Sequence, residues 1–510
     1  RYGGAISVQN ARGITIRNVF VRRGQNGVLL DRVTDSKIYD NDLSFLSGWG
    51  LAMWRSSGNT ITRNAIDFCV RGHVEGVYNR GQDSAGIKFF EQCSKNVVAE
   101  NSATHGGDGF FGFAGLEALG EVAPVDGKAE DFDATRKGSN DNLFIDNDFS
   151  YAPAHGIEMT FGFGNMYIRN RLVENAICGF WGGYSQDSLI AENEFVGNGG
   201  MAYGLERGGV NIEHSANNRI LNNTFRDNKV AVHIWWDPDA LPTSSKWGKA
   251  NYKGVVDNVI ANNTIKMTPN HPFKPRGNRQ GRVEQLLGLQ LRDDTPAGQP
   301  RRIINTMYFG NDVEIKDNAG KEFALTEGIE LNKEKPGASL LAYEIPKYEV
   351  LGSTKPVGAR TELRGRDKII MDEWGPWDHK SPMLMEETVS SAGAVYRVFG
   401  ISEPVKIVDS AKGEWKVTTE SSGIVLTRAL KPGFQTWTAD ISAEGLSRTI
   451  SGSALLVDWD ISVFSWKDQA DPRKDLEGWR KLAKGSSAVD FKHDQAFTFP
   501  FGGGGFGAGS

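Results

Sequence analysis

The first half of the chain alternates apolar and polar positions in short segments, and the pattern repeats. Glycine opens many segments and apolar residues follow at alternate positions, as in Gly27-Val-Leu-Leu and Gly156-Ile-Glu-Met. Alternation with a period of two is typical of half-buried β-strands. Asparagines punctuate the same stretch in a regular register. They are Asn18, Asn41, Asn64, Asn101, Asn147, Asn170, Asn193, Asn223 and Asn263.

The spacing of these asparagines defines the repeat. Four of their eight successive intervals are 23 residues long, and the other four are lengthened by insertions. A repeat of roughly 20 to 50 residues indicates a solenoid or another array. Because each repeat holds two or three short strands and lacks helical periodicity, the sequence predicts an all-β fold, the right-handed parallel β-helix. We expect the asparagines at its corners, in left-handed or turn geometry, stacked into a hydrogen-bonded ladder.

The regular repeat of strands and asparagines ends at about residue 270. A degenerate last rung is expected near residues 312–318, and short strands farther on predict a β-sandwich-like domain. The chain opens inside a rung and ends in glycine-rich sequence, so we expect a fragment of a larger protein. The predicted parts are the β-helix at 1–335, a polar connector at 336–382, the sandwich-like accessory domain at 383–465 and a truncated further module at 466–510.

Composition narrows the class of protein. The 510 residues are 39% apolar, hold no apolar run long enough to span a membrane, and carry a net charge of -5. So small a charge gives no reason to expect binding to nucleic acid or to a membrane surface. The three cysteines have no metal-type spacing and cannot form a disulfide framework, so neither a metal site nor a cofactor is predicted.

The insertions mark the expected binding face. They fall at about 66–85, 114–138, 196–208 and 236–256, and each lies directly before or after the same column of strands. Long loops that gather beside one column of a rigid solenoid usually form the walls of its binding groove. That strand column is therefore the predicted floor of a groove.

The floor residues follow from the strand period, because side chains in a strand point alternately inward and outward. When the apolar positions are placed inward, aromatic and ionisable residues share the outward side. Aromatic rings stack on sugars while polar groups bind hydroxyls, so this mixture predicts a polysaccharide or oligosaccharide site. A cover formed by a loop or by the C-terminal domain would make the same rings interface core. The outward residues are Trp54, Phe90, Phe111, Phe113, Trp181, Trp235, Lys88, Glu158, Asn211, Glu213 and His233.

The asparagine ladder, the glycine-led strands and the rung length resemble the right-handed parallel β-helix proteins of the pectate-lyase-like superfamily, over about residues 1–270. The resemblance implies a carbohydrate-active protein, since that superfamily holds polysaccharide lyases, glycoside hydrolases and non-catalytic repeat proteins. The sequence lacks the paired aspartates of polygalacturonases, and it lacks the acidic calcium cluster and arginine of pectate lyases. The activity therefore stays open.

Hydrolysis is the first hypothesis. Glu158 and Glu213 lie two rungs and two residues apart, which puts their Cβ atoms on the order of 12 Å from each other. Side chains that lean together would reach the separation of an inverting acid and base. Asp237 and Asp108 are alternates for the two roles.

Two other functions remain open. A lyase on a uronate polymer would use Lys88 or His233 as its base, Arg207 on a wall loop to hold the sugar carboxylate, and a calcium ion if it follows other lyases. A non-catalytic glycan-binding or structural protein is the third hypothesis. His155 and His214 are expected to cap turns. A large glycan as substrate would place the protein outside a bacterial cell, on its surface or in its periplasm, and the sequence indicates no oligomeric state.

Overall fold

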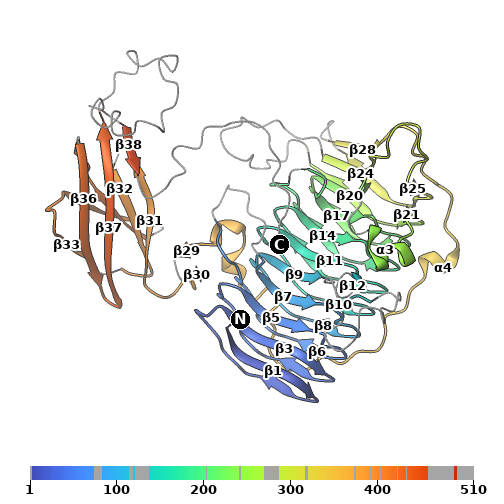
Figure 1. Ribbon diagram of the computed structural model, residues 1–510, viewed down its shortest axis with the longest axis horizontal. Helices are drawn as coiled ribbons and strands as arrows, with labels where there is room; N and C mark the ends of the chain where they lie inside the picture. The colour runs from blue at the N-terminus through green and yellow to red at the C-terminus, as the bar shows by residue number, and fades with distance from the viewer. Residues whose placement is uncertain are drawn as a thin grey trace, which may run out of the picture. The chain divides into compact units, whose positions relative to one another are not determined.

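A computed structural model describes the chain over the ranges given at the end of this paragraph. The backbone divides into two compact units, residues 1–376 and 377–510. The first is a coil of parallel strands and the second is built from antiparallel strands (Figure 1). The predicted fold class, a right-handed parallel β-helix followed by a smaller β-sandwich-like domain, is confirmed. The described residues are 3–73, 83–113, 119–120, 137–202, 204–239, 243–268, 286–315, 320–372, 375–390, 393–402, 404–421, 423–431, 433–457 and 487–490.

Three parallel sheets run along the coil, and in each of them the strands follow in the order of the chain. Sheet A contains β1 (Gly4–Arg12), β3 (Asn26–Thr34), β5 (Trp49–Trp54), β7 (Ala85–Phe90), β9 (Asp108–Phe113), β11 (His155–Thr160), β14 (Cys178–Gly183), β17 (Gly208–Glu213), β20 (Val230–Trp236), β24 (Leu286–Asp293) and β28 (Gly320–Leu325). Sheet B contains β2 (Thr15–Arg17), β4 (Lys37–Tyr39), β6 (Thr60–Thr62), β8 (Val97–Ala99), β10 (Leu143–Ile145), β12 (Met166–Ile168), β15 (Leu189–Ala191), β18 (Arg219–Leu221), β22 (Val259–Ala261) and β26 (Met307–Phe309). Sheet C contains β13 (Arg171–Val173), β16 (Glu194–Val196), β19 (Thr224–Arg226), β23 (Thr264–Met267) and β27 (Asp312–Ile315).

The inside of the coil is the predicted apolar core. Val28, Leu30, Leu51 and Met53 are buried, as are their counterparts in later rungs. The rungs continue beyond residue 270, because β24 and β28 extend sheet A. β24 lies in a stretch where no strand was predicted, and β27 is the degenerate rung expected near residue 312.

Asparagine ladders bind the corners of the rungs together. Asn41 donates from Nδ2 to Oδ1 of Asn64 over 2.9 Å, and Asn64 donates to Asn101 over the same distance. This ladder continues to Asn311, past the last asparagine predicted. Two further ladders escaped the sequence analysis. Their members are Asn59, Asn96, Asn142 and Asn165 in one, and Asn175, Asn198 and Asn228 in the other.

Two details of the predicted ladder are wrong. Asn18 is not a member, because Val19 takes the ladder position and donates its backbone N–H to Oδ1 of Asn41 over 3.0 Å. Left-handed geometry belongs to the residue before each ladder asparagine, as at Asp40 (φ 54°) and Arg63 (φ 54°). The asparagine itself turns inward, where its amide satisfies backbone groups that the corner leaves without strand partners.

Glycine opens the sheet A strands because neighbouring rungs approach closely there. A Cβ atom on Gly109 would lie 2.6 Å from the carbonyl oxygen of Gly156, and one on Gly156 would lie 2.7 Å from that of Gly179. Neither residue has a positive φ. Close packing, and not the positive φ that tight corners often need, therefore selects glycine at these positions.

The predicted connector lies along the coil. We call residues 338–369 the strap. It contains α4 (Ala338–Leu341), η2 (Thr361–Leu363) and η3 (Arg366–Lys368). Leu340, Leu341, Tyr343 and Ile345 pack against the outer side of sheet B. Farther on, Arg360 binds Asp67 and Asp42 of the coil. The strap thus covers an apolar face that the strand pattern of sheet B leaves outward.

The second unit, described by itself, contains two four-stranded antiparallel sheets. One is formed by β31 (Met383–Ser390), β32 (Gly393–Phe399), β34 (Trp415–Glu420) and β35 (Gly423–Arg428), and the other by β33 (Lys406–Asp409), β36 (Gly433–Ala443), β37 (Leu446–Val457) and β38 (Ser487–Asp490). Tyr396 and Leu426 from one sheet share a core with Trp437 and Ile441 from the other. Most of the predicted module at 466–510 lies outside the described residues. Within the described part of the chain, no helix is long and apolar enough to cross a membrane.

Candidate active site on the outer face of sheet A

Strand register brings most of the predicted site residues onto one face. Lys88 pairs with Phe111, Phe111 with Glu158, and Glu158 with Trp181 along one outward column of sheet A. The same column continues through Asn211 to His233. A second outward column, two residues farther along the strands, contains Trp54, Phe90, Phe113, Glu213 and Trp235.

The aromatic residues separate into two groups. Trp54 and Phe90 are partly exposed and stacked, with ring centroids 4.0 Å apart, and Phe111 and Phe113 are also partly exposed. Trp181 and Trp235 are buried, with exposed fractions of 8% and 6%. The prediction that all six rings face solvent is therefore wrong for these two.

The two tryptophans are buried by different contacts. Met201 and Ala202, on the loop before β17, pack with Trp181. Trp235 donates from Nε1 to Oδ1 of Asn211 over 2.9 Å. Part of the floor is thus covered by one of the predicted walls.

A groove opens over the first rungs of sheet A. It has a volume of about 590 Å³, and its lining includes Gln9, Asp31, Trp54, Lys88 and Phe90. The described parts of the predicted walls are 66–73, 83–85, 119–120, 137–138, 196–202, 204–208, 236–239 and 243–256, and the remaining wall residues lie outside the described part of the chain.

Lys88 connects this groove with the ionisable part of the face. Its Nζ lies 4.3 Å from the centroid of the Trp49 ring and 5.0 Å from that of Phe111. Burial lowers the pKa of Lys88 to about 8, although the negative charges of Asp83, Asp108 and Glu158 act in the opposite direction. An amine with such a pKa is close to the form that accepts a proton at neutral pH.

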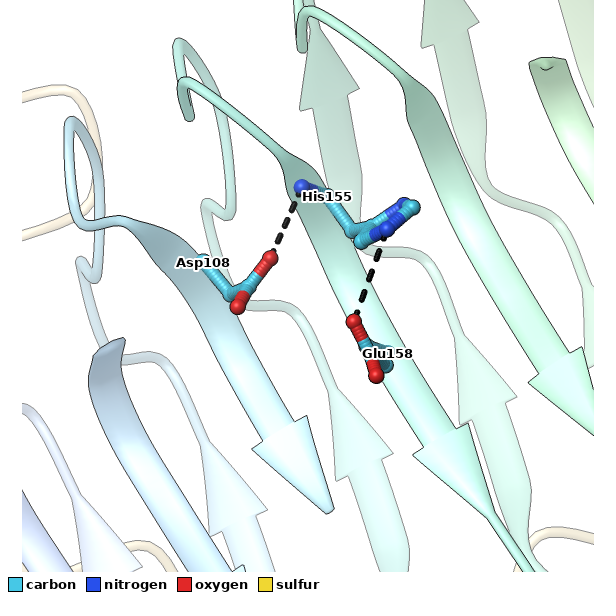
Figure 2. Close-up of side chains that lie close together, drawn as sticks. All are labelled: Asp108, His155 and Glu158. Atoms are coloured by element: carbon cyan, nitrogen blue, oxygen red, sulfur yellow. Dashed lines mark hydrogen bonds and ion pairs between the residues drawn. The ribbon is translucent and has the colours of Figure 1, made fainter. Parts of the chain in front are cut away.

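Asp108, His155 and Glu158 form a compact polar cluster on this face (Figure 2). His155 Nε2 lies 3.4 Å from Oε2 of Glu158, and Oδ1 of Asp108 accepts the backbone N–H of His155 over 2.9 Å. Each of the three residues offers one atom within 4.8 Å of the others, and all three are buried. The prediction that His155 caps a turn is wrong, because it opens β11.

Glu206 joins this cluster to the second predicted carboxylate. Its Oε2 lies 3.7 Å from Nε2 of His155. Burial raises the pKa of Glu213 well above its ordinary value, and the charges of Glu206, Asp237 and Asp239 raise it further. Sequence reasoning missed Glu206, because it lies on an irregular loop where no strand period could mark it.

Asn211 and His233 are less accessible than predicted. Both are fully buried. Asn211 donates to the carbonyl oxygen of Leu205 over 2.9 Å, and its Nδ2 lies 3.0 Å from Nδ1 of His233. Burial lowers the pKa of His233 well below its ordinary range, and the positive charge of Arg207 adds to the effect. The two side chains therefore hold the loop that carries Glu206 and do not face the groove.

Asp237 lies at the edge of this face. Its Oδ1 is 2.9 Å from Nε2 of His214, whose Nδ1 is 2.9 Å from the hydroxyl of Tyr252. His214 directly follows β17 and has a φ of 47°, the left-handed geometry of a corner between strands. The wall loop behind it contains α3 (Lys246–Asn251), which packs Trp247 against Phe163.

Comparisons with known proteins agree with the architecture. Residues 4–115 and 130–246 match the family described as "Right handed beta helix region". No curated protein matches the chain.

Several solved structures resemble the chain at low sequence identity. The A-module of a mannuronan C-5 epimerase from Azotobacter vinelandii is 13% identical, with a TM-score of 0.28, and the match covers 66% of this chain and 91% of that one. A surface adhesin of Streptococcus pneumoniae is 8% identical, with a TM-score of 0.33 and coverage of 59% and 71%. An alginate lyase from Paenibacillus sp. is 10% identical, with a TM-score of 0.28 and coverage of 61% and 79%.

Proposed function

We propose that this chain binds a polysaccharide on the outer face of sheet A and cleaves it by hydrolysis. One observation carries the proposal: an aromatic groove and a group of buried carboxylates occupy neighbouring positions on one rigid sheet. Lys88 lines the groove and lies within the electrostatic reach of Asp108 and Glu158. A sugar chain stacked on Trp54 and Phe90 would therefore extend toward the carboxylates. On such a substrate the protein would work outside a bacterial cell or in its periplasm.

Hydrolysis of a glycosidic bond needs a protonated carboxyl group and a second, ionised carboxylate. Glu213 suits the first role, because its buried position favours the protonated form. Glu158 suits the second, as the base that activates water, because it faces the same side of the sheet two rungs earlier. Glu206 lies near both His155 and Glu213 and adds a third carboxylate to the same face.

The test is a panel of purified polysaccharides, with release of reducing ends as the readout. We expect Glu213→Gln and Glu158→Gln to lower kcat/KM on the cleaved glycan by about 10²- to 10⁴-fold, the usual range for general acid or base groups. Glu194→Gln is the matched control, because that side chain lies on sheet C and is 45% exposed. Full activity in both active-site variants, or no cleavage of any glycan, would overturn the proposal.

Elimination is the second candidate, and the lowered pKa of Lys88 favours it. A neutral amine beside the groove could remove the proton next to the carboxylate of a uronate sugar. An unsaturated product that absorbs in the ultraviolet would identify this reaction. Lys88→Met would then abolish turnover, whereas hydrolysis would survive it at a reduced rate.

A further inference from the structure

The imidazole of His155 is buried between two carboxylate oxygens at unusual distances. Its Nε2 lies 3.4 Å from Oε2 of Glu158 and 3.7 Å from Oε2 of Glu206. Hydrogen bonds from nitrogen to oxygen are usually about 2.9 Å long, and those to charged groups are shorter still. Two ligands bound tetrahedrally at zinc distances of about 2.1 Å lie roughly 3.4 Å apart. The distances from Nε2 to these two oxygens are therefore close to the spacing of neighbouring ligands around an ion.

The charge of the cluster leads to the same conclusion. Asp108 and Glu158 are buried, and Glu206 is largely shielded from solvent. Glu158 and Glu206 each have an oxygen near Nε2 of His155, and an oxygen of Asp108 lies within 4.8 Å of the ligand atoms of His155 and Glu158. Buried carboxylates are normally paired with cations or coordinate metals. Lys88 lies within electrostatic reach of Asp108 and Glu158. A divalent ion would place further positive charge among these carboxylates.

The scaffold holds these side chains in place. Asp108 and His155 open neighbouring strands of sheet A, and the backbone N–H of His155 fixes one oxygen of Asp108 (Figure 2). Glu158 follows three residues later on β11, and Glu206 approaches from the loop before β17. Three of the four groups thus stand on strands, where their positions vary little.

We propose that Asp108, His155, Glu158 and Glu206 bind one divalent transition-metal ion of the Zn²⁺ type. An imidazole nitrogen among carboxylate oxygens suits zinc or manganese, whereas calcium takes oxygen ligands. The proposal does not rest on glycan cleavage, because binding of an ion is measured without any glycan.

The test uses the full chain after EDTA treatment and dialysis, titrated with ZnCl₂, MnCl₂ and CaCl₂ in a calorimeter. We expect one equivalent of Zn²⁺ per chain, bound more tightly than Ca²⁺. His155→Ala should weaken Zn²⁺ binding by about 100-fold or more, and Glu206→Gln by about 10-fold or more, since even outer-shell changes cost 10- to 100-fold. Glu206 lies on a loop, so its variant should fold even if His155→Ala does not. Glu194→Gln should bind as the parent does.

Co²⁺ provides a second readout, because its visible absorption reports a tetrahedral site. That absorption should appear in the parent protein and in Glu194→Gln and disappear in His155→Ala. The proposal is overturned if the EDTA-treated protein binds neither Zn²⁺ nor Mn²⁺, or if Glu206→Gln binds Zn²⁺ as tightly as the parent. Either result would indicate a protonated histidine held by carboxylates. Zn²⁺ binding without glycan cleavage would reject the proposed function and leave the metal site standing.

Discussion

The outer faces of sheets A and B belong to the same coil, but they differ in what they carry. On sheet B, Leu143, Leu189 and Leu221 point outward, and the strap covers them with its own apolar residues. On sheet A, Lys88, Glu158 and Glu213 point outward and are buried nevertheless. Covering an apolar side chain stabilises a protein, whereas burying an ionisable one costs free energy unless it is paired.

Under the proposed function, this difference separates a structural face from one that binds and cleaves a glycan. Leucine on sheet B needs only a cover, and the strap provides it. Buried carboxylates on sheet A bring no comparable gain in stability, so their concentration there supports the proposed function. Changes to the strap should therefore affect unfolding, and changes to the face of sheet A should affect binding and turnover.

The largest effect is expected where the strap is anchored. Arg360 donates from Nε to Oδ2 of Asp67 over 2.8 Å, and Asp67 is only 1% exposed. Arg360→Ala leaves that carboxylate buried without its cation, which typically costs about 3 to 5 kcal/mol. Urea unfolding should show this loss, while glycan turnover and Zn²⁺ binding by the folded protein stay unchanged. Arg17→Ala, at an exposed position of sheet B, is the control. If it lowers the free energy of unfolding as much as Arg360→Ala does, the buried anchor has no special role in stability.

The next largest effect is expected at the aromatic groove on sheet A. Trp54 stacks on Phe90 at the floor of the groove. Trp54→Ala should raise KM for the cleaved glycan about tenfold, which corresponds to about 1.4 kcal/mol of binding energy, with little change in kcat. Phe20 is 70% exposed and lies outside that groove, so Phe20→Ala should leave KM alone. A loss of stability without a change in KM would make Trp54 a structural residue.

Much of the coil could be predicted from the sequence, because a period of two and a repeat of 23 residues are properties of the chain itself. Inward positions such as Val28 and Leu30, and the pairing of Glu158 with Trp181, follow from these periods alone. The connector itself was predicted, but its docking on sheet B was not, because the docking depends on contacts between residues more than 100 positions apart, such as the hydrogen bond from Arg219 to the carbonyl oxygen of Ala342. No local pattern reveals such a contact.

The site was predictable only in part, for the same reason. Register placed Lys88, Glu158 and Glu213 on one face. Glu206 lies on a loop without periodicity, and the covering of Trp181 depends on how that loop folds. The role of His155 depends on distances to two side chains, one of them on that loop, which spacing along the chain does not give.

A smaller effect should depend on pH. Burial alone would raise the pKa of Asp42, but the hydrogen bond from Arg22 and the charge of Arg360 outweigh burial and hold the pKa below its ordinary value of 3.8. A carboxyl group with a lowered pKa stabilises the fold above the unfolded value, and the contribution is lost as pH falls through the folded pKa.

Asp42→Asn tests that contribution. The variant should unfold about 1 kcal/mol more easily near neutral pH, a value reduced by solvent screening because the side chain of Asp42 is 31% exposed. The difference should shrink as pH falls below 3.8. Urea unfolding at stepwise lower pH measures it, with the exposed Asp35→Asn as control. A difference that grows toward acid pH would mean that the pKa is raised instead.

The smallest effect is expected at the surface of the strap. Lys37 and Glu349 lie 3.4 Å apart, and their side chains are 47% and 60% exposed. Pairs this exposed contribute little, so Glu349→Gln should change the free energy of unfolding by less than about 0.5 kcal/mol. Urea unfolding of both proteins at low and at high salt measures this difference, because salt screens the ion pair. Suppose instead that Glu349→Gln lowers the free energy of unfolding by more than about 1 kcal/mol and that high salt abolishes the difference. Surface charge would then hold the strap on sheet B, in place of the apolar contacts and the buried Arg360 pair.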